Sequence, residues 1–246
     1  MKLPGLEDCS LCPLYLTRTH AIAGEGSLSS EIFLIAQAPG SMEDEANRMF
    51  VGQTGETFWK LLEEAQADVS NLYVTNLIKC RLPHNRKPKQ SEIQTCSHYL
   101  EQELAAVKPK IVCPLGYYAT KYIFESRKLG LFTKEDYPAL IGKAFVSEDF
   151  IVLPLTHPTS LIHHPQFWQE TVKRYHRAFH LNPCKWFSCC PMRTFTVNRL
   201  IDFHWTDEYC LADWQSCKRY ELESLGIPHS DYVLPDGTFL TPADIN

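Results

Sequence analysis

Residues 32–40 read Ile32-Phe33-Leu34-Ile35-Ala36-Gln37-Ala38-Pro39-Gly40, an apolar run followed by a polar residue and a Pro-Gly pair. A continuous apolar run of this length, without alternation of polar residues, is typical of a strand that is buried on both faces. The Pro-Gly pair marks the loop that follows it. Three further runs have the same form, so we predict four buried strands, at residues 32–36, 72–78, 110–116 and 150–155.

Helical patterns separate these runs, and one of them begins with Ser91 and Gln94 at capping-box spacing. Strands that alternate with helices favour a parallel sheet covered on both faces. We therefore predict an α/β fold with three α/β/α layers and a central four-stranded, mostly parallel sheet. Ligands of such sheets bind beyond the carboxyl ends of the strands. The expected helices span residues 57–67, 91–107, 119–125 and 167–180.

Composition limits the classes of protein that the chain can belong to. Its 246 residues are 44% hydrophobic and 22% charged, which excludes a disordered chain and allows one core with a small additional module. The net charge is −5, so binding of nucleic acid requires a local basic patch. Residues 79–89 supply one, since they hold five basic residues and no acidic one.

Ten cysteines are many for a chain without a secretion signal at its start. In a reducing compartment, clustered thiols are better explained as metal or iron–sulfur ligands than as disulfides. No window approaches the roughly 18 consecutive apolar residues of a membrane span. We expect a cytoplasmic, monomeric protein without membrane contact. Cys113 lies inside an apolar run and is expected to be a small core residue.

The alternation of strands and helices stops near residue 182, and we expect two domains, 1–182 and 183–246. The second is a small cysteine-rich module that holds much of the acidity, with nine of the 29 acidic residues and two of the 24 basic ones after residue 201. This acidity favours a contact with a repair protein, or a structural cap, over DNA binding. Four of its thiols are expected to form a second zinc or iron–sulfur site: Cys184 (or Cys189), Cys190, Cys210 and Cys217.

Three blocks of sequence resemble the family 4 uracil-DNA glycosylases. The first joins residues 35–40 to Glu43-Asp44 and to Met49-Phe50-Val51-Gly52-Gln53-Thr54-Gly55. The second is Thr75-Asn76-Leu77-Ile78-Lys79-Cys80-Arg81 with Asn85-Arg86, and the third is His157-Pro158-Thr159-Ser160-Leu161-Ile162. The resemblance covers about residues 5–181 in the right order. It implies a monofunctional enzyme that flips uracil out of single- or double-stranded DNA, hydrolyses the N-glycosidic bond and leaves an abasic site for base-excision repair.

The resemblance also implies a 4Fe-4S cluster, because Cys9, Cys12, Cys80 and Cys96 are similar to the four ligands of that family. Spacing alone does not separate this cluster from zinc, since both accept four thiolates.

Each substrate-binding residue has a functional and a structural interpretation. Phe50 suits stacking on a flipped base, and the carboxamide of Asn76 can meet N3–H and O4 of uracil. The alternatives are loop packing for Phe50 and a turn or cap for Asn76. His157 is placed to hydrogen-bond O2 of the departing base. The backbone of Ala38, Pro39 and Gly40 is expected to approach the sugar or the base.

Gln37 departs from the family, which usually has glutamate there. An amide can orient the attacking water but cannot accept its proton. We expect Gln37 to position the water, with Glu43 or Asp44 as electrostatic help. The change also leaves open a specificity shifted to other deaminated bases, or a non-catalytic iron–sulfur protein that binds uracil or DNA.

Phosphates are the expected partners of the basic stretch, with a solvated loop as the alternative. His163 stands where family members often carry arginine. An apolar wedge at residues 161–162 is expected to fill the space that a flipped base leaves, with core packing as the alternative. The expected DNA contacts are Arg81, Arg86, Lys87, Leu161, Ile162 and His163.

Overall fold

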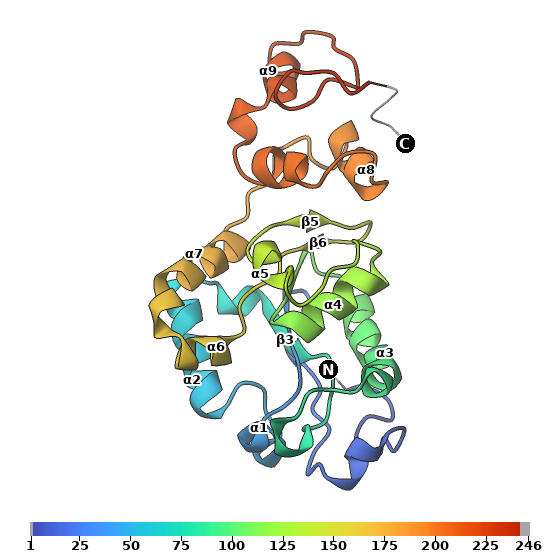
Figure 1. Ribbon diagram of the computed structural model, residues 1–246, viewed down its shortest axis with the longest axis vertical. Helices are drawn as coiled ribbons and strands as arrows, with labels where there is room; N and C mark the ends of the chain where they lie inside the picture. Colours follow the sequence, from blue (N-terminus) through green and yellow to red (C-terminus); the bar gives the residue numbers. More distant parts are fainter. Residues whose placement is uncertain (1, 242–246) are drawn as a thin grey trace.

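The computed structural model describes residues 2–241, in which one mixed sheet lies between two layers of helices (Figure 1). The strand order is β1-β3-β2-β4-β6-β5. The four inner strands are parallel, as predicted, and the two edge strands pair antiparallel. The strands are β1 Glu25–Gly26, β2 Ile32–Ala36, β3 Leu72–Asn76, β4 Ile111–Pro114, β5 Phe145–Val146 and β6 Ile151–Val152.

The side chains of β2 alternate between two hydrophobic cores, and this alternation creates the layers. Ile32 and Leu34 face α2, α6 and α7, while Phe33 and Ile35 face α3 and α4. All five residues of β2 are buried. The predicted three-layer α/β/α fold is therefore confirmed. The α-helices of this part are α1 Ser41–Ala46, α2 Gly52–Glu64, α3 Gln90–Val107, α4 Tyr117–Ser126, α5 Tyr137–Leu140, α6 Pro158–His163 and α7 Trp168–Phe179.

Helix α3 begins earlier than the sequence pattern predicts. Its N-cap is Lys89, whose backbone N–H donates to the Glu92 carboxylate at 2.8 Å. The Ser91–Gln94 pair is therefore not the cap. A carboxylate three residues into the helix satisfies a free backbone donor and interacts favourably with the helix dipole, which a neutral amide cannot do as well.

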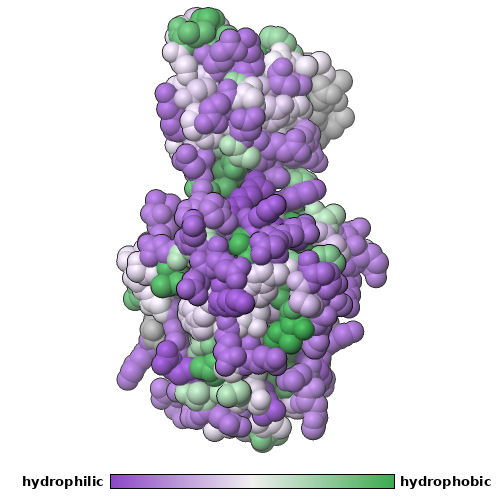
Figure 2. All heavy atoms as spheres, turned by 90° about the vertical axis from the view of Figure 1, so that its left-hand side faces the viewer, coloured by the Kyte–Doolittle hydropathy of each residue, from purple (hydrophilic) through white to green (hydrophobic). Residues whose placement is uncertain are grey.

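The chain after α7 forms one end of the molecule (Figure 1). It contains α8 Pro191–Val197, the π-helix η5 Thr206–Cys210 and α9 Lys218–Ser224. The molecule narrows where this C-terminal segment, residues 183–246, meets the rest (Figure 2). Asp207 joins the two parts: its carboxylate accepts from the Ala144 N–H at 2.7 Å and from Arg177 Nη2 at 2.6 Å. Met192 and Leu211 pack against the same core as α7.

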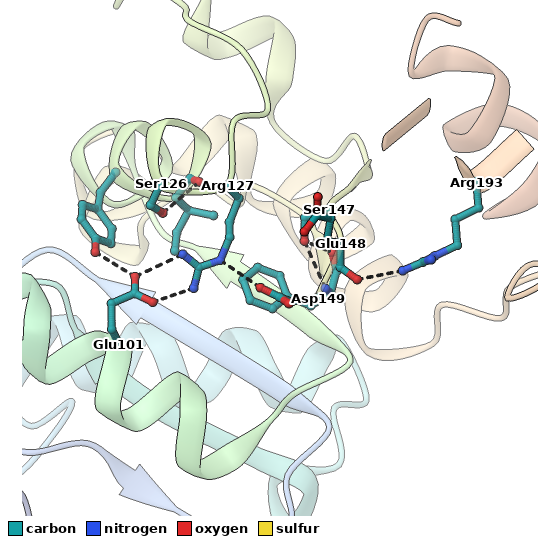
Figure 3. Close-up of polar contacts among 10 residues, drawn as sticks. Glu101, Ser126, Arg127, Ser147, Glu148, Asp149 and Arg193 are labelled. Atoms are coloured by element: carbon teal, nitrogen blue, oxygen red, sulfur yellow. Dashed lines mark hydrogen bonds and ion pairs between the residues drawn. The ribbon is translucent and has the colours of Figure 1, made fainter. Parts of the chain in front are cut away.

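A cavity of about 1200 Å³ lies between the two parts, lined by residues 124–131, 145–149 and 196–203 together with Glu101. Arg127 lines this cavity. Its guanidinium donates to Glu101 at 2.7 Å and pairs with Asp149 at 3.5 Å (Figure 3). Arg193 reaches over from α8 and donates to the Glu148 carbonyl at 2.9 Å (Figure 3). The Arg193 hydrogen bond therefore connects the rim of this cavity to the C-terminal segment.

Short 3₁₀ helices complete the described secondary structure. They are η1 Pro13–Leu16, η2 Val69–Asn71, η3 Pro83–Asn85, η4 Pro165–Phe167 and η6 Trp214–Ser216. Among the described residues, no helix combines the length and the apolar character that a membrane crossing requires.

Candidate functional site

The ends of β2 and β3 are joined by backbone hydrogen bonds beyond the last ladder pair. Ala36 pairs with Asn76, and then the Leu77 N–H donates to the Ala36 carbonyl at 2.8 Å and the Ile78 N–H to the Gln37 carbonyl at 3.0 Å. Both strands are parallel, so their carboxyl ends meet at one edge of the sheet. Gln37 and Asn76 are therefore brought together, as the sequence predicts.

Asn76 is buried, and its amide contacts the loop that precedes α2. Its Nδ2 donates to Met49 Sδ at 3.2 Å. A thioether is a weak acceptor, so this contact satisfies the amide poorly. Met49 belongs to the first sequence block without a predicted role, and its sulfur ties the Asn76 carboxamide to the loop that holds Phe50.

Phe50 has a left-handed backbone conformation, with φ +50°. Its ring stacks on Phe58 of α2, with the ring centroids 3.8 Å apart and 14° between the planes. Gly55 permits this arrangement, because a Cβ there would overlap the Phe50 carbonyl. The same carbonyl accepts from Trp59 Nε1 at 3.1 Å. One face of the phenyl ring is thus covered by α2, which supports the loop-packing interpretation and leaves the stacking role a prediction.

His157 is the N-cap of α6, and its Nδ1 accepts a hydrogen bond from the Thr159 N–H at 3.2 Å. Burial lowers the pKa of His157 to about 4. The imidazole is therefore neutral at neutral pH, and Nε2 carries its proton. The ring can donate one hydrogen bond from Nε2 without first being charged.

A pair of hydroxyl groups links the first sequence block to the third. Thr54 Oγ1 in α2 lies 3.2 Å from Thr159 Oγ1 in α6. Together with the Asn76–Met49 contact, this pair ties the loop of Phe50 to the strand end of Asn76 and to the helix of His157. The three blocks therefore form one region at the carboxyl edge of the sheet. Of the three cavities that we describe within residues 2–241, none is lined by Phe50, Asn76 or His157.

The two acids near Gln37 have different surroundings. Asp44 is buried, and its carboxylate accepts from the backbone N–H groups of Thr19 and His20 at 2.9–3.0 Å. These contacts give Asp44 a structural task, so the electrostatic help expected from it is not supported. The carboxylate of Glu43 lies against Gly40, where an added Cβ would collide with its Oε2. Of the pair, Glu43 is the acid that borders the Pro39-Gly40 loop.

The four cysteines of the first set line one small cavity, although two come from the chain start, one follows β3 and one lies on α3. Arg18 Nη1 donates to Cys80 Sγ at 3.0 Å, and the Lys79 N–H donates to Cys96 Sγ at 3.3 Å. Burial raises the pKa of Cys96 to about 12, against the backbone hydrogen bond from Lys79. Four thiols around one cavity fit a four-thiolate centre, and the thiols would release their protons to solvent on binding it.

Within residues 2–241, no three cysteine, histidine or acidic side chains are grouped as around a single metal ion. A tetrahedral zinc ion draws thiolates to about 3.8 Å from one another. A cluster holds them farther apart, because each thiolate binds a different iron.

A buried ion pair lies next to these thiols. Lys79 Nζ donates to Glu103 Oε2 at 2.5 Å, and neither side chain is exposed. Glu103 also accepts from the Gly24 N–H at 2.7 Å and from Thr75 Oγ1 at 2.7 Å. The pair thereby joins α3 to β3, between Asn76 and Cys80. A charged residue inside an apolar stretch, such as Lys79, indicates from the sequence that a buried partner exists. Glu103 and Arg18 have no such sequence context, so their contacts could not be predicted.

The residues expected to contact DNA are not equally accessible. Arg86 makes a bidentate pair with Glu92 of α3, at 2.9 and 2.5 Å, so an acid neutralises part of the basic stretch. Lys87 is exposed, whereas Arg81 is half-buried. Leu161 is buried in the core, which favours the packing alternative over the wedge. Ile162 is half-buried, and His163 is exposed.

Comparison with known proteins identifies the fold family. Residues 23–179 match the family model of the uracil DNA glycosylase superfamily. The chain is 36% identical over 166 residues to a type-4 uracil-DNA glycosylase of Sulfurisphaera tokodaii, an alignment covering 64% of this chain and 73% of the relative. It is 33% identical to the type-4 enzyme of Saccharolobus solfataricus (65% and 75% covered) and 32% identical to that of Thermotoga maritima (64% and 79%).

The matched region contains β2, β3, β4 and β6 and all three blocks that meet at the carboxyl edge of the sheet, and it ends before the C-terminal segment. The fold, the blocks and these relatives agree, and the chain belongs to the type-4 uracil-DNA glycosylases of the uracil DNA glycosylase superfamily.

Proposed function

We propose that this protein is a DNA-repair glycosylase that hydrolyses the N-glycosidic bond of uracil in DNA, with His157 as the group that stabilises the departing base. The observation that carries this role is the hydrogen bond from the Thr159 N–H to His157 Nδ1. It leaves Nε2–H as the free donor of a neutral ring. Such a donor stabilises the negative charge that develops on O2 of uracil, and it does so without proton transfer.

Asn76 and Phe50 are the proposed binding residues for the flipped base. Uracil would replace the weak contact between Asn76 Nδ2 and Met49 Sδ with a hydrogen bond to O4, while Asn76 Oδ1 accepts from N3–H. Cytosine presents the opposite donor and acceptor at these atoms, so it would leave buried polar groups unpaired. Phe50 would stack on the base, and the backbone of Ala38-Pro39-Gly40 would border it.

Gln37 is proposed to orient the attacking water, because its carboxamide follows β2 at the same edge. Glu43, whose carboxylate borders Gly40, is the proposed electrostatic partner of the cationic sugar. A site in which no carboxylate at position 37 takes the proton requires a dissociative reaction, in which the bond to the base breaks before water adds.

Cys9, Cys12, Cys80 and Cys96 are the proposed ligands of a 4Fe-4S cluster. When bound, such a cluster supplies a covalent clamp between the chain start, α3 and the segment after β3. Cys80 directly follows Lys79 and lies four positions after Asn76, so the clamp would hold the recognition strand in place. The hydrogen bonds of Arg18 and of the Lys79 N–H would stabilise the thiolates.

The exposed part of the basic stretch is proposed to contact phosphates. Lys87→Ala should weaken DNA binding equally for all sequences and reduce the slope of log K against log salt by about one. Arg86→Ala should reduce this slope less, because Glu92 already neutralises Arg86. Fluorescence anisotropy with labelled DNA from low to physiological salt measures both slopes. Equal losses for the two variants would contradict the assignment.

The test of function uses oligonucleotides that carry one uracil, hypoxanthine or xanthine, single- and double-stranded, followed by alkali cleavage of abasic sites. We expect release of uracil, with activity reduced roughly 100-fold or more by His157→Ala. Asn76→Ala should lose discrimination as well as rate. Gln37→Ala should lower the rate at unchanged binding. Binding without cleavage of any base would show the non-catalytic alternative to be right, and preferential release of hypoxanthine or xanthine would show shifted specificity.

We also propose that the chain is divided at residue 182 into a glycosylase domain and a C-terminal module, and that it acts as a monomer. The end of the family match at residue 179 supports the division. The acidic character of the module supports a role in contacting a protein partner more than a role in contacting DNA.

A further inference from the structure

We infer that the C-terminal segment holds a second iron–sulfur cluster on Cys184, Cys190, Cys210 and Cys217, outside the region that the family model matches. These four thiols come from different turns of the segment, separated by up to 33 positions, and all of them line one cavity of about 350 Å³. Cys210 and Cys217 are buried, and Cys184 and Cys190 are half-buried.

A backbone contact holds two of these cysteines side by side. The Cys184 N–H donates to the Cys210 carbonyl at 2.8 Å, although the two residues are 26 positions apart. A cationic iron centre binds such thiols as thiolates. Their convergence is unusual for core cysteines, which act as small apolar residues and have no reason to face one cavity.

Arg219 supplies an independent indication of an anionic ligand. It lines the same cavity and is 5% exposed. Its Nη1 donates to the backbone carbonyls of Ser230, Asp231 and Val233, whereas its Nε, also buried, has no hydrogen-bond partner in the described part of the chain. A buried guanidinium N–H without a partner costs free energy. A thiolate-bound cluster carries net negative charge and offers sulfur acceptors, which would satisfy it.

The first set of cysteines has the same plan. There too four thiols from three distant parts of the chain line one cavity, and an arginine, Arg18, donates to one of the sulfurs. In both sets a cysteine is the N-cap of a helix whose next residue is proline, Cys12 before Pro13 and Cys190 before Pro191. The N-terminal segment that holds Cys9 and Cys12 lies at the opposite end of the molecule from the C-terminal segment (Figure 1), so the two centres would be far apart.

The spacing of the thiols favours a cluster over zinc. Within residues 2–241, no three of them are grouped as around a single metal ion, which is the arrangement that zinc requires. The cavity is also lined by Trp186, Phe187, Met192 and Trp214, beside the charged Glu223 and Asp231, and its apolar part would shield a cluster from water. A segment of about 60 residues with a thin core would also gain stability from the centre.

Metal analysis of the anaerobically purified full-length protein tests the inference. Two clusters give about eight irons and eight acid-labile sulfides per chain. The double variant Cys210→Ser/Cys217→Ser should retain about half of the iron, of the sulfide and of the visible absorbance. Cys189→Ser is the matched control: this exposed thiol borders the same cavity but is outside the proposed set, and the variant should keep the full content.

A complementary variant keeps the inference testable if the C-terminal substitutions unfold the segment. Cys9→Ser/Cys12→Ser leaves residues 183–246 unchanged and should still hold about four irons and four sulfides. Four irons in the unaltered protein, complete loss of iron from the Cys9/Cys12 variant, or one zinc per chain that disappears with Cys210 and Cys217 would each overturn the second cluster. None of these readouts depends on glycosylase activity.

Discussion

His157 is neutral over the pH range in which it is proposed to act, and this has a measurable consequence. Burial lowers its pKa to about 4, below the value of about 6.5 for an unfolded histidine. As the pH falls, the unfolded chain binds this proton first. The contribution of His157 to stability is therefore complete above pH 6.5 and is lost as the pH falls from there towards 4.

The ring resonances of His157 in a two-dimensional NMR titration should shift with a midpoint near pH 4, and the rate of uracil release should show no ionisation of this residue between pH 6 and 8. His163 is exposed and serves as an internal comparison. A midpoint above 6 for His157 would mean that a charged imidazole, rather than a neutral donor, faces the base.

Phe50 offers a comparison of side-chain and backbone effects at one position. Phe50→Ala removes the stack on Phe58 but keeps a Cβ at φ +50°, whereas Phe50→Gly removes both the ring and the backbone strain. Both variants should be destabilised by about 3 kcal/mol or more through the lost ring. Phe50→Gly should nevertheless be about 1 kcal/mol more stable than Phe50→Ala. Urea unfolding measures the difference, and a less stable glycine variant would contradict a left-handed Phe50.

At the level of elements, the buried pair Lys79–Glu103 fixes α3 against β3. Lys79→Met should cost about 3–5 kcal/mol, because it leaves the Glu103 carboxylate buried without its cation. Removing both charges should cost less than the sum of the single changes, although the Gly24 N–H and Thr75 hydroxyl then lose their acceptor.

The control for this cycle is the exposed pair Lys60–Glu64, where Lys60→Met should change the free energy of unfolding by less than about 0.5 kcal/mol. Chemical unfolding of the four Lys79/Glu103 variants gives the coupling energy. Strict additivity would show that the two side chains do not interact in the folded protein.

The inner strands were predictable because each is a continuous apolar run. The edge strands were not, because a two-residue strand such as Glu25–Gly26 is too short to show a hydrophobic pattern. β6 ends early, since Pro154 has no N–H to donate, yet the Leu155 N–H still bonds to the Pro114 carbonyl at 3.0 Å. Hydrogen-bond pairing therefore continues along the predicted run.

The candidate site was predictable where strand ends and sequence blocks coincide, as at Asn76 and His157. The site was not predictable at positions where a contact depends on packing between elements that are distant in the sequence. Met49 and Thr159 are ordinary residues for their positions, and only the approach of α2 to β3 and α6 gives them partners. Leu161 fits either a wedge or a core residue by sequence, and only its place behind α2 separates the two.

For the whole molecule, Asp207 determines how the C-terminal segment is attached. Its buried carboxylate accepts from Ala144 and Arg177, so Asp207→Ala leaves the Ala144 N–H without its acceptor and Arg177 with only the Gly142 and residue 207 carbonyls. We expect faster cleavage by protease near residues 180–190 and greater hydrogen exchange in β5, with uracil release largely retained.

Asp202→Ala is the matched control for this variant. Asp202 is exposed, and its side chain bonds to His204 within its own turn. Equal protease sensitivity of the two variants would show that Asp207 is not the attachment point.

The two rims of the sheet are each only two residues long and run opposite to their neighbours. A foreign strand that tried to extend the sheet would find almost no free backbone to match. This protein should therefore stay dispersed in concentrated solution and resist seeding into fibres. Aggregation of this protein should then require partial unfolding, because the edge strands of the folded sheet do not promote it.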